Sequence, residues 1–209
     1  MKKLHLIFVL LFAGSTLFGQ SVEMLFDSLT NQISKAEKPS DYALLAASFN
    51  ALTAMESAPW EAGYYHSYCL LMEANGTDTD SKKDALLDQA ETKVNELLKM
   101  MPREDELYVL RAFINQVRIS VSPMMRGMKY SGLANVDLAV AIEIDKNNPR
   151  AWFLKAMNTY YTPAMFGGGK EKACPLFQKA SGLFAGQNKE AKIGWGAEIN
   201  SQMLKSCGQ

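Results

Sequence analysis

The chain has 209 residues, of which 48% are hydrophobic, and its 22 basic and 22 acidic side chains give a formal net charge of zero. The hydrophobic content excludes an intrinsically disordered chain. Lysines and arginines are scattered along the sequence, which argues against a nucleic-acid-binding protein because phosphate recognition needs a clustered positive face.

The first 19 residues have the layout of a secretory signal peptide. A basic start at Met1–Lys3 is followed by an apolar run over 4–13 and then by small and polar residues up to Gly19. The run is shorter than the ~20 residues that a membrane-spanning helix needs. We therefore expect a signal peptide over 1–19 and a single exported domain over 20–209, periplasmic or extracellular, with no membrane insertion after cleavage. Loss of Lys2 and Lys3 lowers the formal net charge from 0 to −2.

The mature sequence predicts helices throughout. Apolar residues such as Leu107, Leu110, Ile114 and Val117 recur every three or four positions, which places them on one helical face. Proline and glycine clusters divide the chain into about nine helices of ordinary length. The expected helix pairs cover about 21–57, 59–101, 103–147 and 149–187, followed by a terminal helix over 189–206.

An internal period of about 44 residues links these pairs. The aromatic residues Tyr64, Tyr108 and Trp152 are 44 residues apart, and a proline precedes each of them. Four residues after the second and third aromatic come Ala112 and Ala156. Trp195 follows Trp152 by 43 residues, so we expect it to open the terminal helix. Such self-similarity is typical of stacked helical repeats.

The third repeat resembles a tetratricopeptide repeat (TPR). The segment AWFLKAMNTYY (151–161) is similar to the first TPR helix, with Trp152 at the large aromatic position and Ala156 at the small one. KEKACPLFQKA (170–180) is similar to the second helix. The resemblance implies an all-α fold, a short α-solenoid of antiparallel helix pairs, like that of small exported single-domain TPR proteins. The period exceeds the ~34 residues of the standard repeat, and the extra residues lie between the two helices of a pair.

The resemblance also implies a binding groove. In TPR proteins, side chains two before, one after, five after and eight after the aromatic position point into the groove. Such a lining of aromatic and methionine side chains would suit a peptide or an apolar helix. Alternatively, a short array closes on itself and its terminal helices cover several of these residues. The corresponding residues are Ala62, Tyr65, Cys69, Met72, Glu106, Val109, Phe113, Gln116, Arg150, Phe153, Met157 and Tyr160.

The glycine run before Lys170 has two interpretations. GGGK is reminiscent of a phosphate-binding loop, but a P-loop requires GxxxxGK followed by Ser or Thr, and here Glu171 follows. Three glycines after Pro163 also allow a sharp turn between antiparallel helices. We expect the turn, with positive φ angles at the glycines.

Methionines, cysteines and the remaining histidine provide no recognisable catalytic or metal site. Met124, Met125 and Met128 carry thioethers that suit Cu(I), but methionine also fills gaps in helical cores, and we expect that role here. His66 has no triad partners and is expected to be a partly buried, hydrogen-bonded histidine. Cys69 is expected to be a buried thiol. Cys174 and Cys207 would pair if the last two helices pack side by side.

These observations predict a non-enzymatic binding or scaffolding module of the cell envelope. We expect it to bind a protein or peptide partner through the groove, without a cofactor or metal. The alternative is a small envelope hydrolase or ligand-processing protein with its site in the same groove.

Overall fold

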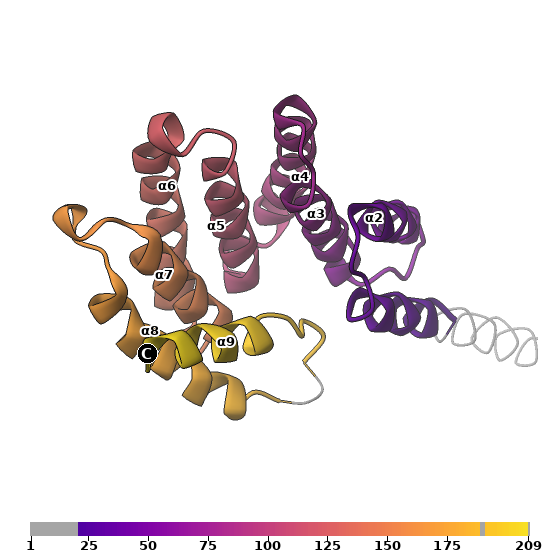
Figure 1. Cartoon of the computed structure of the whole chain (residues 1–209). Coiled ribbons are helices and arrows are strands. Elements are labelled where there is room, and N and C mark those ends of the chain that lie inside the picture. Colours follow the sequence, from indigo (N-terminus) through magenta and orange to yellow (C-terminus); the bar gives the residue numbers. More distant parts are fainter. Residues whose placement is uncertain (1–20, 189–190, 209) are drawn as a thin grey trace, which may run out of the picture.

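The computed structural model describes residues 21–188 and 191–208. The predicted signal peptide over 1–19 therefore lies outside the described residues. Within the described ranges every regular element is helical, which confirms the predicted all-α class (Figure 1). No helix in these ranges is long and apolar enough to cross a membrane.

From α2 to α9, each α-helix packs against the next one along the chain. Helix α3 also contacts α5, and α5 contacts α7, so these three helices form one row of the array. We call the surface of this row the inner face. The described part of the first helix covers 21–33, and the elements after it are α2 (Pro39–Thr53), α3 (Trp60–Asn75), α4 (Asp80–Met100), α5 (Asp105–Ile119), α6 (Pro123–Ile144), α7 (Pro149–Tyr161), η1 (Ala164–Phe166), α8 (Lys170–Ala185) and α9 (Ala197–Cys207).

The apolar stripes that predict the helices also form the core. Leu107, Leu110 and Ile114 of α5 have no exposed surface. Ala112 and Ala156, the small residues of the repeat, are equally buried. A methyl group at these positions lets neighbouring helices approach closely, as the repeat pattern requires.

The second and third repeats share a hydrogen bond that the first lacks. The Tyr108 hydroxyl donates to the carbonyl of Pro102 (3.1 Å), and the Trp152 indole N–H donates to that of Lys146 (2.9 Å), each six residues earlier. Tyr64 is instead fully buried, and its hydroxyl accepts a hydrogen bond from Trp195. The first repeat is therefore adapted to hold the C-terminal part of the chain.

The glycine run forms the expected turn between α7 and α8. Gly167 and Gly169 have φ angles of 87° and 110°, which favour glycine. A Cβ on Gly168 would lie 2.1 Å from the Thr162 carbonyl oxygen. The N–H of Gly169 donates to the Thr159 carbonyl at 2.8 Å, which closes the turn.

The terminal helix begins later than the sequence predicts. Residues 191–196 are not helical, and α9 starts only at Ala197. Gly196 has a φ of 103°, which is incompatible with a right-handed helix. Trp195 therefore precedes the helix instead of opening it as Trp152 does in α7, and the expectation for this segment is wrong.

The methionines near the start of α6 do not fill the core. Met124, Met125 and Met128 are 99%, 84% and 83% exposed, so the expectation of core packing is wrong. In the same turns of α6, Arg126 is the residue that contacts a neighbouring helix, by pairing with Asp84 of α4 (2.6 Å).

The cysteines have two different environments. Cys174 of α8 and Cys207 of α9 form a disulfide with an S–S distance of 2.04 Å. Cys69 is a buried free thiol, as expected, and burial raises its pKa to about 12.

Candidate binding site on the inner face

The inner face is partly covered by the chain itself. Among the predicted groove residues, seven are buried and only five keep part of their surface exposed. Whether they contact a ligand stays a prediction, but the structure separates the accessible ones from the rest. The buried set is Ala62, Tyr65, Cys69, Glu106, Val109, Arg150 and Phe153, and the partly exposed set is Met72, Phe113, Gln116, Met157 and Tyr160.

The cover is the non-helical segment 191–196, which we call the strap. The Tyr65 hydroxyl donates a hydrogen bond to the Lys192 carbonyl (2.8 Å). The hydroxyl oxygen of Tyr65 in turn accepts a hydrogen bond from the Gly194 N–H (3.3 Å). The Lys192 ammonium lies 5.6 Å from the ring centroid of Phe26 in the first helix. Figure 1 shows the yellow C-terminal segment lying beside the array instead of extending away from its end.

The centre of the strap is the indole of Trp195, which stacks between two aromatic rings. Its ring centroid lies 5.5 Å from that of Tyr68 in α3 and 5.4 Å from that of Phe113 in α5, with an interplanar angle of 28° in both pairs. The indole N–H donates to the Tyr64 hydroxyl at 2.8 Å. Trp195 is only 9% exposed. We call the space between Tyr68 and Phe113 the aromatic slot.

Gly196 brings the strap against the third repeat. A Cβ at this position would lie 3.0 Å from Phe184 Cζ and 3.5 Å from Phe153 Cδ1. The positive φ and this close approach both require glycine. The strap thus contacts α3, α5, α7 and α8 in succession, and it covers the predicted groove between the first and third repeats.

Burial keeps the tyrosine hydroxyls of this site protonated. Desolvation raises the pKa of Tyr65 to about 12 and raises that of Tyr64 and Tyr68 further. These phenols therefore act as neutral hydrogen-bonding groups at physiological pH.

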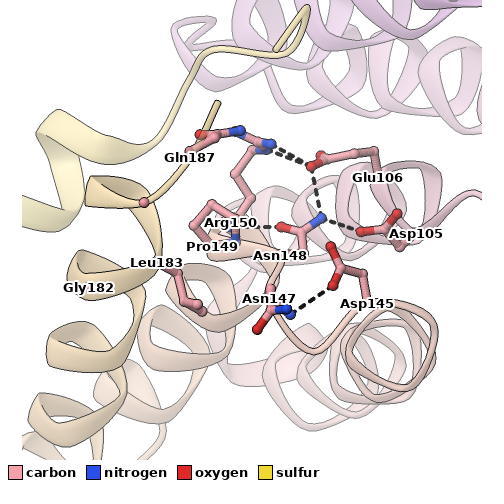
Figure 2. A pocket seen from close by; sticks show the side chains of 11 residues that line it. Asp105, Glu106, Asp145, Asn147, Asn148, Pro149, Arg150, Gly182, Leu183 and Gln187 are labelled. Atoms are coloured by element: carbon pink, nitrogen blue, oxygen red, sulfur yellow. Dashed lines mark hydrogen bonds and ion pairs between the residues drawn. The ribbon is translucent and has the colours of Figure 1, made fainter. Parts of the chain in front are cut away.

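A polar pocket lies next to the strap, at the first turns of α5 and α7 and the end of α8 (Figure 2). Its volume is about 460 Å³. The Arg150 guanidinium pairs with Glu106 Oε1 at 2.6 Å and donates to Gln187. Asn148 caps α7 by accepting from the N–H groups of Arg150 and Ala151, and its amide donates to Glu106 and Asp105.

This polar network joins the second and third repeats rather than facing a partner. Glu106 and Arg150, which the TPR resemblance places in the groove, are almost completely buried and pair with each other. Burial raises the pKa of Glu106, an effect that the Arg150 guanidinium offsets in part. The Arg150 guanidinium also lies 6.0 Å from the Trp195 ring, so the network borders the aromatic slot.

The accessible part of the inner face is apolar and aromatic. Phe113 covers one face of the slot, and the Gln116 amide next to it donates to the Leu154 carbonyl of α7 (2.8 Å). Tyr160 packs against Phe177 with 6.2 Å between ring centroids. These side chains can form dispersion and stacking contacts with a flat or extended apolar ligand.

Sequence reasoning did not place Tyr64, Tyr68 or Trp195 in this site, because the repeat period assigned Tyr64 and Trp195 to helix positions. The available signal is the Gly-Trp-Gly sequence at 194–196, because glycines on both sides of a tryptophan argue against a helix.

No group of three or more His, Cys, Asp or Glu side chains within 21–188 and 191–208 has the geometry to hold a metal ion. His66 is half-buried, and its Nδ1 hydrogen-bonds the Ala46 carbonyl at 2.9 Å, as expected for a structural histidine.

Comparisons with known proteins identify a similar solved structure. No protein-family model and no curated protein sequence matches the chain. Among solved structures, the HusA haemophore from Porphyromonas gingivalis is 33% identical and superimposes with a TM-score of 0.81. The match covers 88% of this chain and 92% of that chain. The chain belongs to the HusA family. This membership agrees with an all-helical binding protein, and it does not establish the TPR assignment.

Proposed function

We propose that this chain is an exported, non-enzymatic binding protein whose ligand is haem, held on the inner face of the helical array. The observation that carries the proposal is the 33% identity to a haemophore over nearly the full length of both chains. At this identity and coverage the two proteins share their fold, which supports the same class of ligand for this chain.

The chemistry of the accessible inner face supports this ligand. Haem is a flat aromatic macrocycle with a mostly apolar surface and two carboxylates at one edge. Phe113, Met157 and Tyr160 are partly exposed here and offer aromatic and thioether surfaces. Burying apolar area contributes roughly 25 cal/mol per Å², and aromatic stacking adds about 0.5–1.5 kcal/mol per pair.

A second candidate is an extended peptide, which the TPR resemblance favours. The strap is itself an extended segment that lies on the inner face, and its backbone is bound there by the Tyr65 hydroxyl. A peptide from a partner protein would make the same kind of contact.

Export follows from the predicted signal peptide over 1–19 and is supported by the disulfide between Cys174 and Cys207. Disulfides persist mainly in oxidising compartments outside the cytoplasm. We therefore place the protein in the periplasm or outside the cell.

The test is a titration of the mature chain (20–209) with hemin, followed by Soret absorbance. Wild-type protein is expected to saturate at one hemin per chain. Phe113→Ala is expected to weaken binding about tenfold, because a large aromatic contact is lost. The control is Val136→Ala on α6, an apolar residue that is 62% exposed outside the inner face. Absence of saturable binding by the wild type would exclude haem as the ligand.

A further inference from the structure

We propose that the aromatic slot is a ring-binding subsite that the chain's own Trp195 occupies, and that one edge of a flat aromatic ligand replaces the indole when it binds. The identity of the ligand as haem rests on the proposed function. The existence of the slot rests on the stacking geometry alone.

The geometry of the slot fits one flat ring. Tyr68 and Phe113 both stack on the indole, at centroid distances of 5.5 and 5.4 Å and with the same small interplanar angle of 28°. Offset stacking at such distances is favourable for any aromatic ring, not only for indole. The hydroxyl of Tyr64, which now accepts from the indole N–H, would offer a ligand a polar contact inside the slot.

The strap is held by contacts that can be exchanged. Its links to α3 are the Trp195–Tyr64 hydrogen bond, the two backbone bonds to the Tyr65 hydroxyl and the Trp195–Tyr68 stack. Only the Gly196 carbonyl takes part in a helical hydrogen bond, by accepting from the Asn200 N–H (2.9 Å). Ile193 is buried in the core, so displacement of the strap also removes this side chain from its packing. The strap lies between Cys174 and Cys207, which the disulfide joins. It can therefore leave the slot while α9 stays attached to α8.

Displacement of the strap makes the rings of Tyr68 and Phe113 available for stacking with the ligand. With Trp195 in place, the rings of Tyr68 and Phe113 are both stacked on the indole. The strap then competes with the ligand. The apparent binding constant equals the intrinsic binding constant multiplied by the fraction of chains in which the slot is empty.

Gly196→Ala tests this competition without changing the slot. The added Cβ is strained by the φ of 103° and by Phe184 at 3.0 Å, so the variant weakens docking of the strap and leaves Tyr68, Phe113 and Trp195 intact. We expect hemin affinity to rise about fivefold or more. The matched control is Gly132→Ala in α6, where a Cβ meets no atom within 4 Å, and it should leave affinity unchanged. Unchanged or weaker binding by Gly196→Ala overturns the proposal.

Fluorine NMR follows the ring directly. The chain has three tryptophans, and 5-fluorotryptophan labelling with Trp→Phe variants assigns the signal of each. On saturation with gallium(III) protoporphyrin IX, a diamagnetic analogue of haem, the Trp195 signal should move to the chemical shift of the unfolded chain. If the analogue binds and the Trp195 signal keeps its position, the slot is not a ligand subsite, although the proposed function stands.

A probe without haem separates the two proposals. Trp195→Gly leaves a slot shaped for indole, and free indole is expected to raise its melting temperature, because a ligand that binds only the folded state stabilises it. The effect should disappear in Trp195→Gly combined with Phe113→Ala. If the wild type binds no hemin, the proposed function fails, and the indole result alone decides on the slot. If Trp195→Gly does not fold, Gly196→Ala and the fluorine signal decide.

Discussion

His66 shows how one buried side chain makes the fold sensitive to pH. Desolvation lowers the pKa of its imidazole, and the hydrogen bond to the Ala46 carbonyl offsets this effect only in part. In the unfolded chain a histidine titrates near pH 6.5. As pH falls from this value towards the lower pKa of the folded state, the unfolded chain takes up a proton that the folded chain does not. Stability is therefore fully present above about pH 6.5 and declines below it.

We predict that the free energy of unfolding of the mature chain, measured with urea, decreases as the pH is lowered from 7.5 to 5.5. His66 contributes at most ~1.4 kcal/mol per pH unit to this decrease. His66→Asn keeps a side-chain N–H for the Ala46 carbonyl but does not titrate. The part of the pH dependence due to His66 is the difference between the two proteins. If both lose stability equally, the imidazole is not the titrating group.

At the scale of the helix, the small residues of the repeat set how closely neighbours pack. Ala156 of α7 has no exposed surface, whereas Ala47 of α2 is exposed. We predict that Ala156→Leu lowers the free energy of unfolding by about 1–3 kcal/mol through overpacking. The same substitution at Ala47 should change it by less than about 0.5 kcal/mol. Urea unfolding measures both, and equal tolerance would contradict the packing described for α7.

At the scale of the whole molecule, the disulfide closes the C-terminal end of the array. The bridge between Cys174 and Cys207 spans a sequence separation of 33 residues that includes the strap. Cross-links of this length stabilise proteins by about 2–4 kcal/mol, mainly by restricting the unfolded chain. The bridge also keeps α9 beside α8 if the strap moves.

We predict that replacing both cysteines by serine lowers the free energy of unfolding by about 2–4 kcal/mol. Wild-type protein treated with a reducing agent should approach the stability of the double variant. Hydrogen exchange should show the largest loss of protection in α9, because α8 is the helix against which it packs most. A uniform loss over all helices would argue against this local role of the bridge.

The all-α class and the order of the helices could be predicted from the sequence. Both follow from local rules: apolar spacing of three and four residues, prolines before helices and glycines in turns. The turn at Gly167–Gly169 was predictable for the same reason, since positive φ angles are a property of a few neighbouring residues. The exposure of Met124, Met125 and Met128 in α6 was not predictable, because it depends on how the helices pack in the tertiary structure.

Which part of the inner face is accessible depends on long-range packing and could not be predicted from the sequence. The strap binds residues that precede it by 127 to 131 positions, and no local pattern specifies such contacts. Spacing assigned Trp195 to a helix start, whereas its place between Tyr68 and Phe113 results from two helices, α3 and α5, and the strap meeting in space. Stacking and burial are properties of that assembly, so the aromatic slot exists only once the array has folded.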